Sequence, residues 1–264
     1  MFAIVALCAT GARGDEAPSD AAAPVTLTGP PETWGPIKPA TLPAFDEHRA
    51  RSLYDRNCRL CHGEGGAGDG AIARDLEPRP RDLTRGVYKF RSTPTGEPPT
   101  DRDLFDTLTR GLPGTAMSSW SGLSVEDRWQ LVQFVKRLSP RFAATPPETE
   151  LVIGAAPPAD AEHLARGRDA WVKAKCAQCH GDDGRGWGPA ARTQKDDLGR
   201  PIYPFNLTRS DIWRTGGSPA DFYRTLFTGL DGTSMPSYSG ALSDEEAWDL
   251  AHYVRALAVD RRAW

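Results

Sequence analysis

The sequence lacks several features that would have assigned it to a broad class. No apolar run approaches the roughly 18 residues that a membrane-spanning helix needs. Its charges nearly balance, with 32 Lys and Arg against 35 Asp and Glu, so no nucleic acid is an implied partner. No apolar–polar alternation of any length predicts a strand, so we expect an all-α fold. Methionine is also scarce: after the initiator, only Met117 and Met235 remain.

Cysteine is similarly scarce, and four of the five cysteines lie in two copies of one motif. The copies are Cys58-Arg-Leu-Cys61-His62 and Cys176-Ala-Gln-Cys179-His180. In Cys-x-x-Cys-His, one helical turn brings two sulfurs to the vinyl edges of a porphyrin and points the histidine at the iron. Zinc is the alternative, but zinc-binding pairs usually stand about 12–20 residues apart. These pairs stand 118 apart (176 − 58). The motifs therefore predict two covalently bound haem c groups.

The two internal methionines stand at matching distances from the motif histidines. Each lies 55 residues beyond its histidine (117 − 62 and 235 − 180), in a Gly-Thr-x-Met context. Methionine usually fills gaps in a core, but these segments are polar and rich in turns. We therefore predict that Met117 and Met235 are the second axial ligands of the irons. The other histidines, His48, His163 and His252, are expected to be surface or interhelix residues, and they are the substitutes if one methionine assignment is wrong.

The two halves of the chain form an internal duplication at an offset of 118 residues. Leu-Pro-Gly-Thr-Ala-Met117 corresponds to Leu-Asp-Gly-Thr-Ser-Met235, for example. Two repeats indicate a tandem domain pair and not a solenoid. The predicted organisation is a signal segment 1–12, a proline-rich arm 13–44, a first domain 45–140, a linker 141–159 and a second domain 160–264.

Each half has the same predicted order of helices. One helix leads into the motif, at about 45–58 and about 160–176. A second helix is opened by Thr100 or Ser218, and a last one by Ser124 or Ser243, each a good cap residue. The last helices are amphipathic, with their apolar faces expected to form helix–helix core. These faces comprise Trp129, Val132, Val135 and Leu138 in the first half, and Ala247, Leu250, Val254 and Leu257 in the second.

Several other residues are candidates for the surroundings of the haems. A ligating imidazole normally donates its other N–H to a carbonyl or carboxylate. Trp120 and Tyr238, each three residues after a methionine, are candidates to pack on a haem and donate to a propionate, with plain loop packing as the alternative. The basic run 74–91 is a candidate to neutralise propionates or steer a partner, with a solvated loop as the alternative.

These residues resemble the class I cytochrome c family, with two domains in tandem, of the periplasmic bacterial type. The resemblance covers about residues 45–138 and 160–259. It implies that the motif cysteines attach haem, that His62 and His180 are proximal ligands, and that Met117 and Met235 are distal ligands. In that family a proline carbonyl accepts from the proximal histidine, so Pro78 or Pro80 and Pro201 or Pro204 are the candidates here.

The resemblance also implies export, because haem is attached outside the cytoplasm in this family. The apolar opening 2–9, followed by small residues, suits a secretory signal. Cys8 within it is a weaker candidate for a lipid anchor. We therefore expect a periplasmic protein, and association with a membrane complex is compatible with this placement.

Two axial ligands on each iron favour electron transfer over catalysis. We expect a carrier, or the electron-transfer subunit of an oxidoreductase complex, in a bacterial respiratory or photosynthetic chain. Its partners would be a donor oxidoreductase and an acceptor cytochrome or oxidase. A dihaem peroxidase-like enzyme is the alternative and needs one displaceable axial ligand. A haem-based sensor is a third class, but no output segment is visible.

Overall fold

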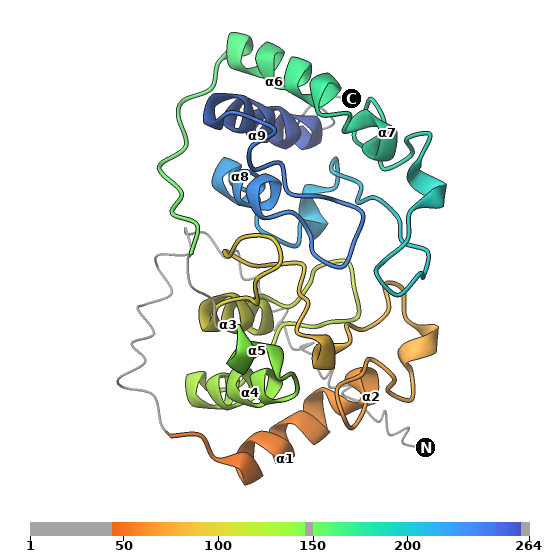
Figure 1. Cartoon of the computed structure of the whole chain (residues 1–264), viewed down its shortest axis with the longest axis vertical. Coiled ribbons are helices and arrows are strands. Elements are labelled where there is room, and N and C mark those ends of the chain that lie inside the picture. The colour runs from red at the N-terminus through yellow and green to blue at the C-terminus, as the bar shows by residue number, and fades with distance from the viewer. Residues whose placement is uncertain (1–43, 146–149, 260–264) are drawn as a thin grey trace, which may run out of the picture. The chain divides into compact units, whose positions relative to one another are not determined.

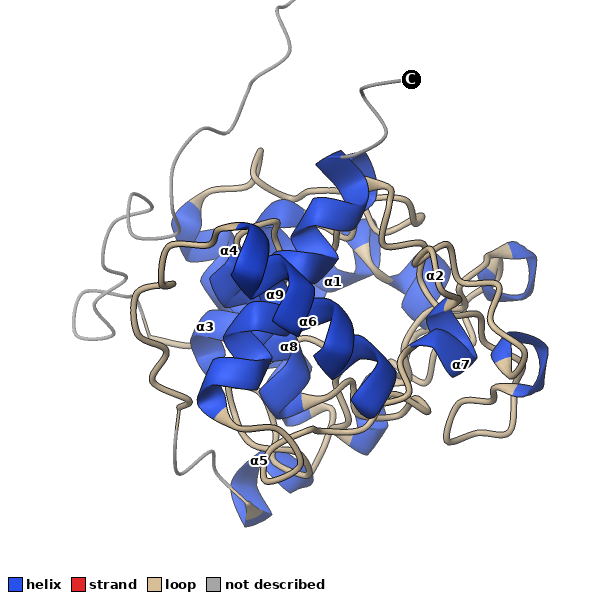
Figure 2. Ribbon diagram, turned by 90° about the horizontal axis from the view of Figure 1, so that it is seen from above, coloured by secondary structure: helices blue, strands red, loops and turns tan. Residues whose placement is uncertain are grey.

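A computed structural model describes residues 44–145 and 150–259 of this chain. The predicted signal segment 1–12, with Cys8, lies outside the described residues, as does the predicted arm up to residue 43. Among the described residues there are helices and two isolated bridges, and no strand, which confirms the all-α prediction (Figure 2). No helix in this part of the chain is both long enough and apolar enough to cross a membrane.

The helices follow one another in the same order in each half. The α-helices are α1 (Glu47–Asn57), α2 (Arg59–His62), α3 (Asp101–Arg110), α4 (Val125–Arg137), α5 (Arg141–Ala144), α6 (Ala161–Lys173), α7 (Ala177–His180), α8 (Pro219–Thr228) and α9 (Asp244–Val259). Short 3-10 helices lie at Ala73–Asp75, Leu83–Arg85, Ala191–Thr193 and Ser210–Ile212. The predicted duplication is therefore present in the fold: α1 to α4 correspond to α6 to α9, with α5 between them.

The helices of each half pack as a small bundle. In the first half α4 packs against α1 and α3, and in the second half α9 packs against α6 and α8 (Figure 1). The second bundle closes around Ala247 and Leu250, both fully buried. In each bundle the motif helix, α2 or α7, follows the first long helix directly. The core therefore sits beside the haem-attachment motif in both halves.

The predicted caps position these helices. Thr100 accepts from the backbone N–H of Asp103, and the Asp103 carboxylate accepts from the Thr100 N–H in return. Ser218 and Asp221 form the same reciprocal pair at α8. Ser124 caps α4. Each cap satisfies donors that a helix start leaves unpaired, so the starts of the helices that follow the motifs are well determined.

The core of α4 is wider than the sequence pattern predicts. Val132 and Val135 are buried, as expected, while Trp129 is only half-buried. Leu131 and Phe134, which the predicted face omits, are 0% and 6% exposed. The sequence pattern predicts a stripe at three-residue steps, whereas α4 is covered on two sides, by α1 and by α3. A helix packed between two others buries a broader arc than a single stripe.

The segment between the bundles contains more structure than a proline-rich connector requires. It includes α5, whose Phe142 is buried, and the Leu151 N–H donates to the Ser92 carbonyl at 2.7 Å. Phe142 and Leu151, on either side of residues 146–149, therefore both contact the first domain.

Candidate haem sites

Each half encloses one large cavity with its motif at the wall. The two cavities have empty volumes of about 1400 and 1390 Å³, which include the solvent-filled space at their openings. The first is lined by both motif cysteines, His62 and Met117, with Leu104 and Leu108 from α3 and Val132 and Val135 from α4. The second is lined by both motif cysteines, His180 and Met235, with Phe222 and Leu226 from α8 and Leu250 and Val254 from α9. The structure thus brings together the attachment cysteines, the histidine and the methionine that the sequence nominated for each haem.

The motif histidines are oriented by backbone carbonyls. His62 Nδ1 lies 3.0 Å from the Arg81 carbonyl oxygen, and His180 Nδ1 lies 3.1 Å from that of Phe205. Burial lowers the pKa of both imidazoles. The neutral form has one N–H, so donation from Nδ1 leaves Nε2 as the nitrogen with a free lone pair. Such a ring is prepared to bind a metal through Nε2.

The accepting carbonyls differ from those expected. Pro80 and Pro204 precede the acceptors, Arg81 and Phe205, by one residue, and neither Pro78 nor Pro201 accepts. The prolines therefore fix the direction of the chain just before the acceptor. The two loops also differ in length: the acceptor lies 19 residues after the histidine in the first half and 25 in the second.

The methionines lie in loops with an identical network of hydrogen bonds. The Leu112 N–H donates to the Met117 carbonyl at 2.9 Å, and the Met117 N–H donates to Thr115 Oγ1 at 3.1 Å. Thr115 Oγ1 in turn donates to the Leu112 carbonyl at 2.7 Å. The same bonds recur among Leu230, Thr233 and Met235. The backbone of each methionine is therefore held in place by its own loop, beside the cavity.

The cysteines do not form a zinc site with the groups around them. Within residues 44–145 and 150–259, no group of three or more His, Cys, Asp or Glu side chains could hold a metal ion. The remaining histidines stand apart from both cavities. His48 is exposed, His163 lies 2.7 Å from Asp160, and His252 lies 2.9 Å from the Pro157 carbonyl.

The polar groups at the cavity walls suit a ligand that carries acceptors. Trp120 lines the first cavity and Tyr238 the second, in agreement with their proposed place beside the haems. Sequence reasoning missed Tyr88 and Trp171, which also line the cavities. Tyr88 Oη and Trp171 Nε1 are buried and have no hydrogen-bond partner among the described residues. Buried donors are rarely left unpaired, so these two fit a bound group that supplies oxygen acceptors, as haem propionates do.

A glycine in the first half lies where the Cys-x-x-Cys-His motif approaches the segment that accepts the His62 hydrogen bond. Gly68 has a φ of 72°, its N–H donates to the His62 carbonyl at 2.9 Å, and a Cβ there would lie 2.8 Å from the Pro80 carbonyl oxygen. Gly186 repeats this arrangement, with a φ of 85° and a Cβ distance of 2.5 Å to the Pro204 carbonyl. The close approach of the two segments therefore requires glycine.

We expect Gly68→Ala to lower the free energy of unfolding by about 2 kcal/mol, because it adds backbone strain and pushes the Pro80 carbonyl away. Gly65→Ala is the matched control, since a Cβ at Gly65 meets nothing within 4 Å. That control should stay within about 0.5 kcal/mol of wild type. Denaturant midpoints of the holoproteins measure both. Equal midpoints for the two variants would show that the close approach is not needed.

The fold and the two cavities define the class. The chain is a tandem class I cytochrome c that carries two covalently bound haem c groups. The family model described as "Cytochrome C oxidase, cbb3-type, subunit III" matches residues 46–135 and 162–254, one match in each half. The chain therefore belongs to this family, which confirms the resemblance drawn from the motifs.

Individual relatives agree with this assignment. The cbb3-type cytochrome c oxidase subunit CcoP of Azospirillum sp. (strain B510) is 29% identical over 233 residues, which are 83% of this chain and 65% of that protein. The subunit FixP of Azorhizobium caulinodans is 27% identical over 209 residues, which are 76% of this chain and 56% of that protein. This chain thus spans less than two thirds of the length of these relatives.

A solved structure is also similar over most of this chain. It is a chain of the reducing HAO-like protein complex of Kuenenia stuttgartiensis, with 40% sequence identity and a TM-score of 0.79. The match covers 82% of this chain and 98% of that chain.

Proposed function

We propose that this chain transfers electrons through two six-coordinate haems, as the electron-transfer subunit of an oxidoreductase complex or as a carrier. One observation carries the proposal. Each cavity has on its wall a histidine with its Nδ1 already bonded and a methionine in a loop held by its own hydrogen bonds. Such a pair saturates an iron and leaves no position for a substrate.

This arrangement supports the following assignment of residues. The four motif cysteines attach the two haems through thioether bonds. His62 and His180 are the proximal ligands, and Met117 and Met235 are the distal ligands. The bound groups supply a reversible one-electron change at iron. The protein orients the imidazoles through the Arg81 and Phe205 carbonyls, holds the methionine loops, and surrounds the site with apolar side chains that exclude water.

The partners and the cellular place are proposed by analogy. The curated relatives are subunits of cbb3-type cytochrome c oxidases, and the similar solved chain belongs to a reducing HAO-like complex. We propose that this chain likewise exchanges electrons with redox proteins of a respiratory chain, within or beside a membrane complex, and that it is exported to the periplasm. The domains proposed for it are 45–140 and 160–264.

Carbon monoxide tests this function directly. A saturated ferrous haem does not bind it, whereas a haem with a vacant or weakly held sixth position does. We expect the dithionite-reduced protein to show no change in its visible spectrum under carbon monoxide, and the half-reduced protein to turn over no hydrogen peroxide. Stoichiometric binding at one haem, together with peroxide turnover, would favour the peroxidase-like alternative instead.

A further inference from the structure

The two cavities share part of their walls. Lys89, Phe90 and Arg214 line both of them. Lys89 and Phe90 belong to the first half, in the loop between Leu83–Arg85 and α3, whereas Arg214 belongs to the loop before α8 in the second half. Each half therefore completes the cavity of the other.

The loops that carry these residues are where the two repeats differ in length. From the histidine's acceptor to the methionine there are 36 residues in the first half (117 − 81) and 30 in the second (235 − 205). The segment from acceptor to methionine is thus six residues longer in the first half. The segment from histidine to acceptor is six residues longer in the second half. Both longer segments make contacts across the halves. Arg85 pairs at 2.7 Å with Asp197, which lies in the longer segment of the second half.

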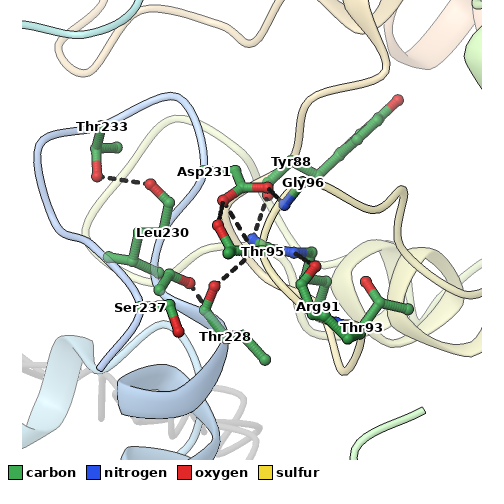
Figure 3. Close-up of polar contacts among 12 residues, drawn as sticks. Tyr88, Arg91, Thr93, Thr95, Gly96, Thr228, Leu230, Asp231, Thr233 and Ser237 are labelled. Atoms are coloured by element: carbon green, nitrogen blue, oxygen red, sulfur yellow. Dashed lines mark hydrogen bonds and ion pairs between the residues drawn. The ribbon is translucent and has the colours of Figure 1, made fainter. Parts of the chain in front are cut away.

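A buried arginine holds the Lys89–Phe90 segment against the second half. The Arg91 side chain is 0% exposed; it donates to the Thr228 carbonyl at 2.5 Å and pairs with Asp231 at 2.9 Å (Figure 3). Asp231 also accepts from Thr95 Oγ1 and from the Gly96 N–H. Because Arg91 follows Phe90 directly, these bonds fix the backbone of the shared wall.

The two cations of this wall lack carboxylate partners. Lys89 makes no hydrogen bond or ion pair with any described residue, and burial, followed by the positive charges of Arg81 and Arg214, lowers its pKa to about 8. The nearby acidic residues are already engaged: Asp196 pairs with Arg200 at 2.8 Å, and Asp197 with Arg85.

Arg214 is in a similar position. In the part of the chain that the structure describes, its polar contact is a 3.5 Å hydrogen bond to the Pro113 carbonyl, and its guanidinium lies 5.1 Å from the centre of the Phe205 ring. Burial lowers its pKa. Lys89 and Arg214 are both half-buried, and a cation partly withdrawn from water is stabilised by a neighbouring anion. Haem propionates are carboxylates, and both haem cavities open onto Lys89 and Arg214.

We propose that Lys89 and Arg214 form one shared propionate-binding site for the two haems, so that each of these two positive charges raises both reduction potentials. The proposal rests on the haem ligation given above. Positive charge beside a haem favours the ferrous state, because reduction adds one negative charge to the site. Phe90, which lines both cavities, adds an apolar side chain to the wall that carries the two cations.

The test is a spectroelectrochemical titration of holoprotein variants, fitted as two one-electron components. Arg214→Gln should lower both midpoint potentials, and Lys89→Gln should do the same. Arg209→Gln is the matched control: this arginine lies five residues upstream, is exposed, and pairs with Asp211 at 2.7 Å. It removes the same charge and should leave both potentials near those of wild type. Arg214→Lys, which keeps the charge, should recover most of the change.

Several outcomes would overturn the proposal. If only one component shifts in Arg214→Gln, Arg214 serves one haem and the site is not shared. If Arg209→Gln lowered both midpoint potentials by as much as Arg214→Gln, the effect would come from general surface charge and not from a shared site. If Arg214→Gln does not assemble, Lys89→Gln decides by the same criterion. Failure of the proposed ligation is recognised separately, because the wild type would then lack two covalent haems or their methionine–iron absorption band.

Discussion

Replacing Met117 by alanine is expected to open the first haem to carbon monoxide while the second stays closed. Without the sulfur, no second histidine and no other methionine among the described residues lies on the first cavity's wall to replace it, because the three other histidines lie elsewhere. The reduced variant should therefore bind one carbon monoxide per chain, against none in wild type. Met235→Ala should bind one at the second haem, and the double variant two. Flash photolysis and optical titration measure the stoichiometry.

A second substitution at the same position tests the direction in which methionine ligation shifts the midpoint potential of the first haem. Thioether sulfur stabilises ferrous iron relative to a second imidazole, so Met117→His should lower one midpoint potential by tenths of a volt, within the range of about 0.8 V that axial ligands span. Ser118→Ala is the control, since Ser118 is the exposed neighbour in the same loop. Carbon monoxide binding unchanged from wild type in Met117→Ala would show that Met117 is not a ligand.

Removal of the buried Arg91 guanidinium is expected to cost about 3 kcal/mol of unfolding free energy. Arg91→Gln leaves the Asp231 carboxylate, 18% exposed, without its cation, and the Thr228 carbonyl without a charged donor. It also releases the bonds to the Tyr88 and Pro94 carbonyls that shape the loop. Because Arg91 joins the two halves, we expect the loss to appear as separate unfolding of the two domains.

Denaturant unfolding, followed by Soret absorbance and by circular dichroism, measures this loss. Arg209→Gln serves as the exposed control and should stay within about 0.5 kcal/mol of wild type. A double-mutant cycle with Asp231→Asn isolates the ion pair itself. If Arg91→Gln were as stable as the control and unfolded in one step, the halves would be held together by other contacts.

The motifs, their spacing and the helix caps could be predicted from the sequence. The Cys-x-x-Cys-His spacing and the matched methionines nominated residues that the fold brings to two cavities. The caps at Thr100 and Ser218 were also predictable, because a cap depends on residues within one turn.

Features that depend on loop paths were beyond the sequence. The acceptors of the histidines lie one residue after the nominated prolines, because the backbone direction at Pro80 and Pro204 decides which carbonyl faces the ring. The basic run 74–91 is a candidate to neutralise propionates or steer a partner, with a solvated loop as the alternative, and our proposal keeps the propionate role for Lys89. Two other members of the run, Arg85 and Arg91, pair with carboxylates in the other half of the chain. Nothing in the local pattern identified Asp197 and Asp231 as their partners, since these contacts join positions more than 100 residues apart.

The most direct test of the central claim is the optical spectrum of the purified oxidised protein, with the methionine-sulfur-to-iron charge-transfer band quantified per covalent haem. Ligation by both Met117 and Met235 predicts two equivalents of the band per chain, falling to one in either alanine variant. One equivalent or none in wild type would mean that a haem has a different or vacant sixth position, and would contradict an electron-transfer role for both sites.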